Sequence, residues 1–293
     1  MLAPWNRAHP LVIVLTAVAA AGCKDNGLTT PFTADAVSAD IGASARDEVE
    51  ATVNALTLPA SLTPLGTTKE AGNPATSCVA PSTPTDTDGD GVPDDATYVF
   101  TAPPCRFTGW RGGTMDIVGS LQVQDPAPTG AGFGYDATLT ALRFRFTGPD
   151  PDVIFDVERN GTRTLSGSVT GLLLTTDLQL RRTFSGKPDA NIDQQWTVNY
   201  TPASQLQING PLNSGTLSIA GTFNWTRGDE NMALTVTTPT PLHYNADCTD
   251  TVQRIDAGEM HLAGDFSDTN GFVRVRWTAC GKDPSFGFGI EGG

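Results

Sequence analysis

Beyond Tyr98, apolar and polar residues alternate with a period of two, and this pattern most limits the folds open to the chain. It is clearest in three stretches, 115–123, 217–225 and 273–277. Successive side chains of a β-strand point to opposite faces of a sheet, so the alternation predicts strands with one buried and one solvated face. No stretch after residue 100 has the spacing of a long helix. The pattern therefore predicts an all-β domain.

The expected architecture is an antiparallel meander of about ten to twelve strands, curled into a barrel or half-barrel. A β-sandwich of two sheets is the alternative. Four glycines recur on the apolar side of the predicted strands, at Gly119, Gly167, Gly221 and Gly264. A glycine there weakens a strand, so we expect sharp bends or the close approach of another backbone, with an N-terminal helix as the neighbour.

Two further signals concern turns and irregularities within the strands. The apolar parity slips at Ala141-Leu142, which predicts a β-bulge. The dipeptides Asn160-Gly161 and Asn270-Gly271 predict two-residue hairpin turns, because both positions of a type I′ turn require positive φ.

One helix is expected before the β domain, at 34–58. Its composition is rich in Ala, Asp, Glu and Val, and Leu58-Pro59 would end it. Apolar residues occur at helical spacing on one narrow face: Val37, Ile41, Ala45, Val49, Val53 and Leu56. A stripe this narrow needs a partner surface, so we expect the helix to pack on the sheet.

The stretch 86–95 carries the one set of residues with recognisable chemistry. Asp86, Asp88 and Asp90 alternate, Gly91 permits a reversal of the backbone, and Asp94 follows. Hard divalent cations prefer six to eight oxygen ligands, including carboxylates and backbone carbonyls. We therefore predict a Ca²⁺ site made of three aspartates at alternate positions, the carbonyl of Val92 and the carboxylate of Asp94, which binds directly or through water. Asp95 is either a ligand or exposed, and a solvated acidic turn without an ion is the alternative.

The loop resembles the Asp-rich loops of thrombospondin type 3 repeats. An EF-hand loop is a poorer likeness, because Thr97 stands where that motif has a bidentate glutamate and Pro93 would disturb the exit helix. The resemblance covers ten residues and implies structural calcium in an extracellular β domain.

The first residues predict export. Arg7 precedes an apolar run from Leu11 to Ala21, too short to span a bilayer and typical of a signal peptide. Gly22-Cys23 then resembles the lipobox of bacterial lipoproteins, although Ala20 replaces the usual leucine. This resemblance implies a lipid on Cys23 and, with Lys24 next, an outer-membrane location. Ordinary cleavage that leaves a free thiol at position 23 is the alternative.

The other four cysteines favour disulfides over a metal knuckle. They are Cys78, Cys105, Cys248 and Cys280, an even number in an exported chain. No two are close enough for a CxxC pair, which disfavours zinc. Three pairings are possible, and we prefer the local ones, Cys78–Cys105 and Cys248–Cys280, each of which would stabilise the fold by about 3–4 kcal/mol.

The charge balance restricts the partners. There are 18 basic and 32 acidic residues, for a net charge of −14, so nucleic acid is not expected to bind. The membrane is expected to be contacted through the lipid alone. Arginines on polar strand faces, among them Arg143 and Arg145, could bind an acidic glycan, but such arginines more often balance acids across a sheet.

The predicted organisation has five parts. They are a signal peptide (1–22), a lipidated cysteine and tether (23–33), the helix (34–58), a Pro-rich and calcium loop (59–95) and the β domain (96–293). No catalytic set is identified, since the HExxH, GxSxG and Walker motifs are all missing. We expect a non-enzymatic binding, adhesive or structural domain; a carrier of apolar ligands or lipids and a carbohydrate-active enzyme are the alternatives.

Overall fold

The fold was examined in a computed structural model, in which Thr33–Gly293 forms one compact unit. The predicted signal peptide, Cys23, the tether and Cys78 lie outside the residues that the structure describes. The described residues are 34–56, 84–108, 113–148, 153–183, 187–249, 253–266 and 270–290.

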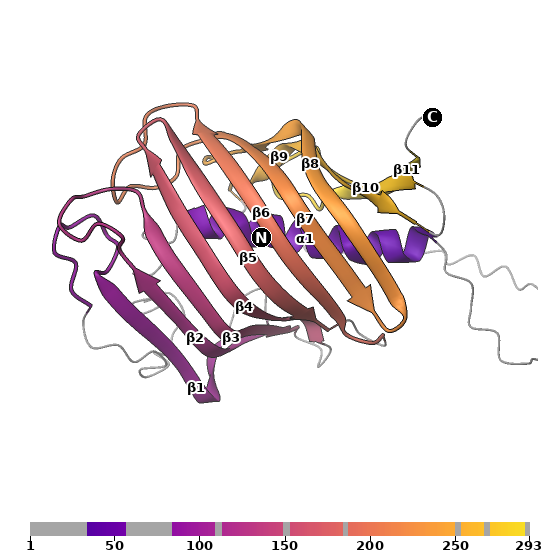
Figure 1. Cartoon of the computed structure of the whole chain (residues 1–293), viewed down its shortest axis with the longest axis horizontal. Helices are drawn as coiled ribbons and strands as arrows, with labels where there is room; N and C mark the ends of the chain where they lie inside the picture. Colours follow the sequence, from indigo (N-terminus) through magenta and orange to yellow (C-terminus); the bar gives the residue numbers. More distant parts are fainter. Residues whose placement is uncertain are drawn as a thin grey trace, which may run out of the picture. The chain divides into compact units, whose positions relative to one another are not determined.

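The unit is built on a single antiparallel sheet whose eleven strands follow one another in chain order (Figure 1). Each strand pairs with the next, and β1 and β11 form the two edges of an open, curled sheet. The predicted all-β meander with one helix is confirmed. The strands are β1 (Asp95–Thr108), β2 (Thr114–Gln124), β3 (Tyr135–Thr147), β4 (Val153–Ser168), β5 (Gly171–Arg182), β6 (Ala190–Pro202), β7 (Gly215–Arg227), β8 (Glu230–Tyr244), β9 (Ile255–Asp265), β10 (Asn270–Trp277) and β11 (Ser285–Ile290).

The alternation in the sequence becomes the two faces of this sheet. In β6, buried and exposed residues alternate from Ala190 to Thr201 without a break. The buried side carries the large aromatic side chains, and the Trp196 and Phe223 rings stack with their centroids 6.0 Å apart. Burial of such rings is the main favourable term in the folding of a sheet like this one.

Helix α1 (Ala34–Leu56) packs on the buried side of the sheet, where Figure 1 shows it crossing the strands. Ile41, Ala45 and Val49 are fully buried. A Cβ added at Gly42 would lie 2.6 Å from the Phe286 ring of β11, so glycine lets the two elements approach closely. The helix ends two residues before the predicted 58. In the described part of the chain, no helix is both long and apolar enough to cross a membrane.

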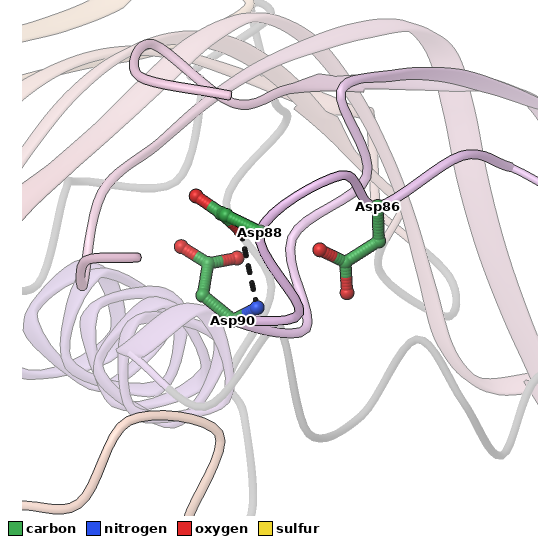
Figure 2. A group of neighbouring side chains, drawn as sticks. All are labelled: Asp86, Asp88 and Asp90. Atoms are coloured by element: carbon green, nitrogen blue, oxygen red, sulfur yellow. Dashed lines mark hydrogen bonds between the residues drawn. The ribbon is translucent and has the colours of Figure 1, made fainter. Parts of the chain in front are cut away.

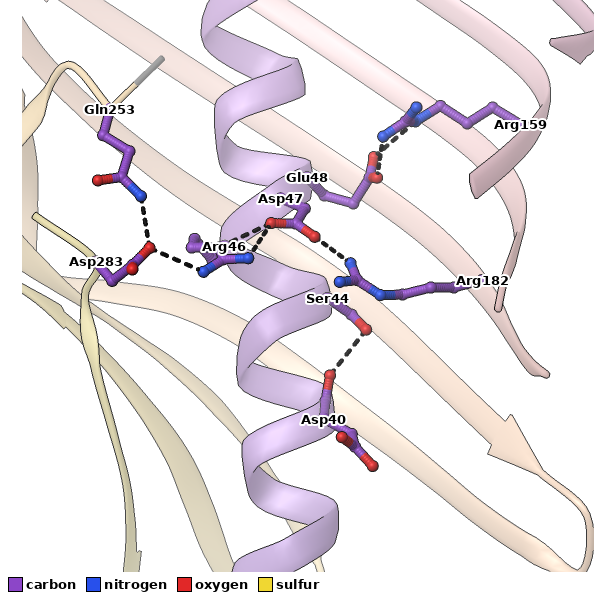
Figure 3. A network of polar contacts seen from close by, with 9 residues as sticks. All are labelled: Asp40, Ser44, Arg46, Asp47, Glu48, Arg159, Arg182, Gln253 and Asp283. Atoms are coloured by element: carbon purple, nitrogen blue, oxygen red, sulfur yellow. Dashed lines mark hydrogen bonds and ion pairs between the residues drawn. The ribbon is translucent and has the colours of Figure 1, made fainter. Parts of the chain in front are cut away.

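Polar contacts also fix α1 to the sheet (Figure 3). Glu48 accepts hydrogen bonds from Arg159 of β4 at 2.5 and 3.3 Å. Asp47 pairs with Arg182 of β5. The helix is therefore buried on several sides, not only along its apolar stripe.

The two Asn-Gly predictions are wrong, because both dipeptides lie within strands. Asn160-Gly161 sits inside β4, where the Asn160 side chain accepts a hydrogen bond from the Ala141 amide at 2.7 Å. This hydrogen bond lies at the β-bulge predicted for Ala141. Ala141 has φ 46°, and the register of β3 with β4 shifts between Leu139 and Leu142. Asn270-Gly271 begins β10. The first Asn-Gly dipeptide therefore lies opposite a β-bulge, and the second lies at the start of a strand.

The recurring glycines do allow close approach, but of neighbouring strands instead of the helix. A Cβ at Gly264 would lie 2.6 Å from the Ala233 carbonyl of β8, and one at Gly221 would lie 3.0 Å from the Trp196 Cα of β6. Gly119 has φ 108° at a register shift between β2 and β3. These glycines let strands bend tightly against each other, which curls the sheet.

The predicted disulfide between Cys248 and Cys280 is present, with the two Cα atoms 5.9 Å apart. It ties the chain after β8 to the chain after β10. Cys105 is buried on β1. Its predicted partner Cys78 is outside the described residues, so that pairing stays a prediction.

Candidate metal centre

The acidic loop runs from residue 84 to 94 and leads directly into β1. Its turns are held by its own carboxylates. Asp86 accepts hydrogen bonds from the amides of Gly89 at 2.8 Å and Gly91 at 3.0 Å. The two glycines have φ of 76° and 90°, a conformation that other residues rarely adopt. The predicted reversal of the backbone therefore occurs at this point.

Three of the predicted ligands converge (Figure 2). Asp86, Asp88 and Asp90 each bring one carboxylate oxygen to within 4.8 Å of the other two. Their burial increases along the loop, from the exposed Asp86 to Asp90, which is 2% exposed. Three negative charges at this distance repel one another, and the repulsion is strongest for the buried members.

Asp90 anchors the loop to the rest of the unit. One of its carboxylate oxygens accepts from the Val92 amide at 2.8 Å, and the other accepts from the Gly132 amide at 3.0 Å. Gly132 lies in the connection between β2 and β3. The loop is thereby attached to a part of the chain about forty residues away.

The remaining predicted ligands are placed differently. The Asp94 carboxylate accepts hydrogen bonds from the backbone amide and the hydroxyl of Thr87, at 3.0 and 2.6 Å, and these bonds hold its pKa below the usual value. Asp95 begins β1 and accepts from Gln122 at 3.1 Å. Val92 is buried. Asp94 is thus turned toward Thr87 and is not one of the three that converge.

Asp125, which sequence reasoning missed, belongs to the same region. It follows β2, it is 8% exposed, and its amide donates to the carbonyls of Pro93 and Asp94 at 3.1 and 3.3 Å. Burial raises the pKa of its carboxyl, a hydrogen bond from the Ala127 amide opposes this, and the negative charges of Asp90, Asp88 and Asp94 add to the rise. The chain has 32 acidic residues, so nothing in the sequence distinguishes this one. Only the pairing of β1 with β2 brings it to the loop.

The donor set fits a hard divalent cation. Oδ2 of Asp88 and Oδ2 of Asp125 are buried and have no hydrogen-bond partner within the described ranges. Buried carboxylate oxygens are nearly always satisfied, and a divalent cation held by Asp86, Asp88 and Asp90 would satisfy the Asp88 oxygen and offset the repulsion among the three. Among the described residues, no arginine or lysine forms an ion pair with Asp86, Asp88, Asp90 or Asp125.

A small hollow adjoins the loop beside Asp90. It has a volume of about 40 Å³ and is lined by Leu56, Phe133, Leu206 and Asn209, among others. This space suits one or a few water molecules and is far too small for a lipid or a sugar.

The two described histidines offer no comparable site. His243 contacts Asp256 at 2.6 Å, and His261 contacts Glu259 at 2.6 Å while stacking on Phe272. Both pairs are partly exposed side-chain contacts at the sheet surface, and we assign them no catalytic role.

Comparisons with known proteins return nothing for this chain: no protein-family model, no curated protein and no solved structure matches it. The class that the fold and the site define is an open antiparallel β domain with an internal helix and an acidic, cation-suited loop. Its function must be argued from these features alone.

Proposed function

We propose that the protein is a lipid-anchored envelope protein whose β domain is a non-enzymatic structural or binding scaffold, stabilised by calcium at the start of the sheet. The observation that carries the proposal is the convergence of Asp86, Asp88 and Asp90, with Asp88 Oδ2 buried and unpartnered among the described residues. Asp125 Oδ2, which is in the same state, lies near the loop at the end of β2. Calcium there would clamp the loop to the end of β2.

The packing of α1 favours a scaffold over a carrier of lipids. Ile41, Ala45 and Val49 of the helix are fully buried against the curled sheet. A carrier needs an open volume of several hundred Å³ for its ligand. Side chains of α1 occupy the space where such a cavity would lie.

Direct binding measurements test the calcium proposal. Calcium titrated into chelator-treated protein, followed by calorimetry, is expected to saturate at a defined ratio, with magnesium binding more weakly because it requires a smaller octahedral shell. Asp90→Asn should remove the binding, while Asp229→Asn, at an exposed turn, should leave it unchanged. Equal binding in both variants would contradict the proposed site.

The anchor is tested separately. Full-length protein expressed in a Gram-negative host should sediment with membranes, and Cys23→Ser should move it to the soluble fraction. A lipid anchor of two or more acyl chains makes membrane attachment stable, so the shift should be nearly complete. Continued sedimentation of the variant would refute the anchor and leave the calcium proposal untouched.

A further inference from the structure

Arg163 of β4 lies inside the unit without a full counter-charge. Its side chain is 11% exposed, and its Nη2 is 3.9 Å from Glu48 Oε2, beyond hydrogen-bonding distance. Glu48 already accepts hydrogen bonds from Nη2 and Nε of Arg159, at 2.5 and 3.3 Å. The Nε and Nη2 atoms of Arg163 are buried and donate to no acceptor in the part of the chain that is described.

Among the described residues, the charges around Glu48 do not balance. Two guanidinium groups, Arg159 and Arg163, share one carboxylate inside the protein. Burial lowers the pKa of Arg163, the nearby charge of Arg159 lowers it further, and Glu48 only partly opposes this. An unpaired buried cation is costly, so a second anion beside Arg163 would stabilise the fold.

Further unpartnered polar atoms continue from Arg163 across the sheet. In the strand register Arg163 lies opposite Thr176 of β5, and Thr176 lies opposite Trp196 of β6. Directly paired side chains have Cβ atoms about 4.5–5.5 Å apart. Thr176 Oγ1 and Trp196 Nε1 are buried, and neither has a hydrogen-bond partner among the described residues. Three adjacent strands thus present unused polar groups on the same face.

Neighbouring positions enlarge the set. Gln194 lies two residues from Trp196 on the same face of β6, and it is fully buried with both amide atoms unpartnered. Trp225 of β7 lies opposite Ile192, next to Gln194, and its Nε1 is also unpartnered in the described structure. From α1, Thr52 adds a buried hydroxyl one turn after Glu48.

This set consists mainly of donors. The guanidinium, the two indole N–H groups and the Gln194 amide donate, the two hydroxyls do either, and only the Gln194 carbonyl must accept. Buried polar atoms of folded proteins are nearly always satisfied, so these groups need an occupant rich in acceptors.

We propose that the face of the sheet beneath α1, centred on Arg163, binds a small oxyanion, a carboxylate or phosphate group. The negative charge would balance Arg163, and the oxygens would accept from the indole and amide donors. The surrounding interior is filled by α1, so the occupant is a small ion, not an amphiphile with a long tail. This site goes beyond the scaffold role and does not depend on calcium.

The test uses the full-length protein in buffer without added calcium, at constant ionic strength set with chloride. Inorganic phosphate, acetate and laurate are added in turn, and thermal unfolding is followed by near-UV circular dichroism. Phosphate or acetate at one hundred times its dissociation constant should raise the melting temperature by about 5 °C. Arg163→Met should abolish the rise, whereas Arg181→Met, the same change at a half-exposed position of β5, should preserve it.

Each result is decisive. A rise with laurate alone that Arg163→Met removes would overturn the small-ion proposal in favour of an amphiphile headgroup, and would require α1 to move. No rise with any of the three, or the same rise in Arg163→Met, would overturn the site and leave water as the occupant. If Arg163→Met does not fold, equilibrium dialysis of labelled phosphate and of labelled acetate against the unmodified protein replaces the variant, and binding well below one ion per chain for both overturns the proposal.

Discussion

Carboxylates cluster in two regions of this unit, and the two clusters differ in whether basic side chains pair with them. On α1, the acids face basic side chains of the sheet: Asp40 pairs with Arg227, Asp47 with Arg182 and Glu48 with Arg159. In the loop before β1, the acids face one another, and no basic side chain among the described residues pairs with Asp86, Asp88 or Asp90.

The difference explains how the two regions are held. The chain itself supplies the counter-charges of α1, so the helix docks through contacts that the sequence encodes completely. For the loop, no basic partner lies among the described residues, and under the calcium proposal a cation from outside supplies the counter-charge. Mutation of a paired residue should therefore reduce stability most at α1, whereas chelation of calcium should reduce stability most at the loop.

The largest effect is expected for Glu48→Gln. The variant removes the carboxylate that the buried Arg159 and Arg163 share, and breaking a buried pair in this way costs about 3–5 kcal/mol. Urea unfolding would measure it. Glu158→Gln is the matched control, because Glu158 contacts the half-exposed Arg181 at 3.6 Å, and loss of a surface pair changes stability by about 1 kcal/mol or less. Equal losses in both variants would contradict the docking of α1 by its buried pairs.

Chelation comes next. A ligand bound only to the folded state at one hundred times its dissociation constant stabilises it by about 2.7 kcal/mol, and EDTA should remove that amount. Thermal unfolding with EDTA, and again after calcium is restored, measures it. The loss should be the same in Glu48→Gln as in the unmodified chain, because distant sites add. A melt that EDTA leaves unchanged would show that the loop acids need no cation.

Asp125→Asn should have a smaller effect whose sign depends on calcium. The pKa of Asp125 is raised in the folded chain, so its contribution to stability is present at low pH and is lost as pH rises through that pKa. Without calcium, the variant should therefore be the more stable chain at neutral pH. With calcium, it should bind the ion about tenfold more weakly, or about 1.4 kcal/mol. Equal affinity in the two chains would remove Asp125 from the site.

The sequence predicted the fold better than the complete site. The period-two alternation and the apolar stripe of α1 are local signals, and both the sheet and the buried helix follow from them. The prediction of a turn at Asn160-Gly161 was wrong because an Asn-Gly dipeptide also suits an irregular position within a strand. Only the pairing of β4 with β3 decides between a turn and such a position.

The loop shows the same limit. Asp86, Asp88 and Asp90 come together because they are close in sequence, so their spacing was enough to predict the group. Asp125 is outside that group, and it comes near the loop only through the register of β1 with β2, where Asp95 lies opposite Gln124. The ion pairs that join α1 to the sheet are also invisible to a reading of the sequence, because each joins residues more than a hundred positions apart.

The smallest effect, on calcium affinity, is expected for Asp94→Asn. This variant tests whether the sequence spacing or the observed side-chain contacts better predict the ligands. Spacing alone makes Asp94 a ligand, whereas in the structure its carboxylate accepts from the amide and hydroxyl of Thr87. An asparagine Oδ1 can still accept from Thr87, so calcium affinity should fall by less than it does in Asp125→Asn. Calorimetry on the two variants side by side measures the order. A larger loss for Asp94→Asn would mean that this carboxylate turns toward the ion when calcium binds, and that the Thr87 contact belongs to the calcium-free loop.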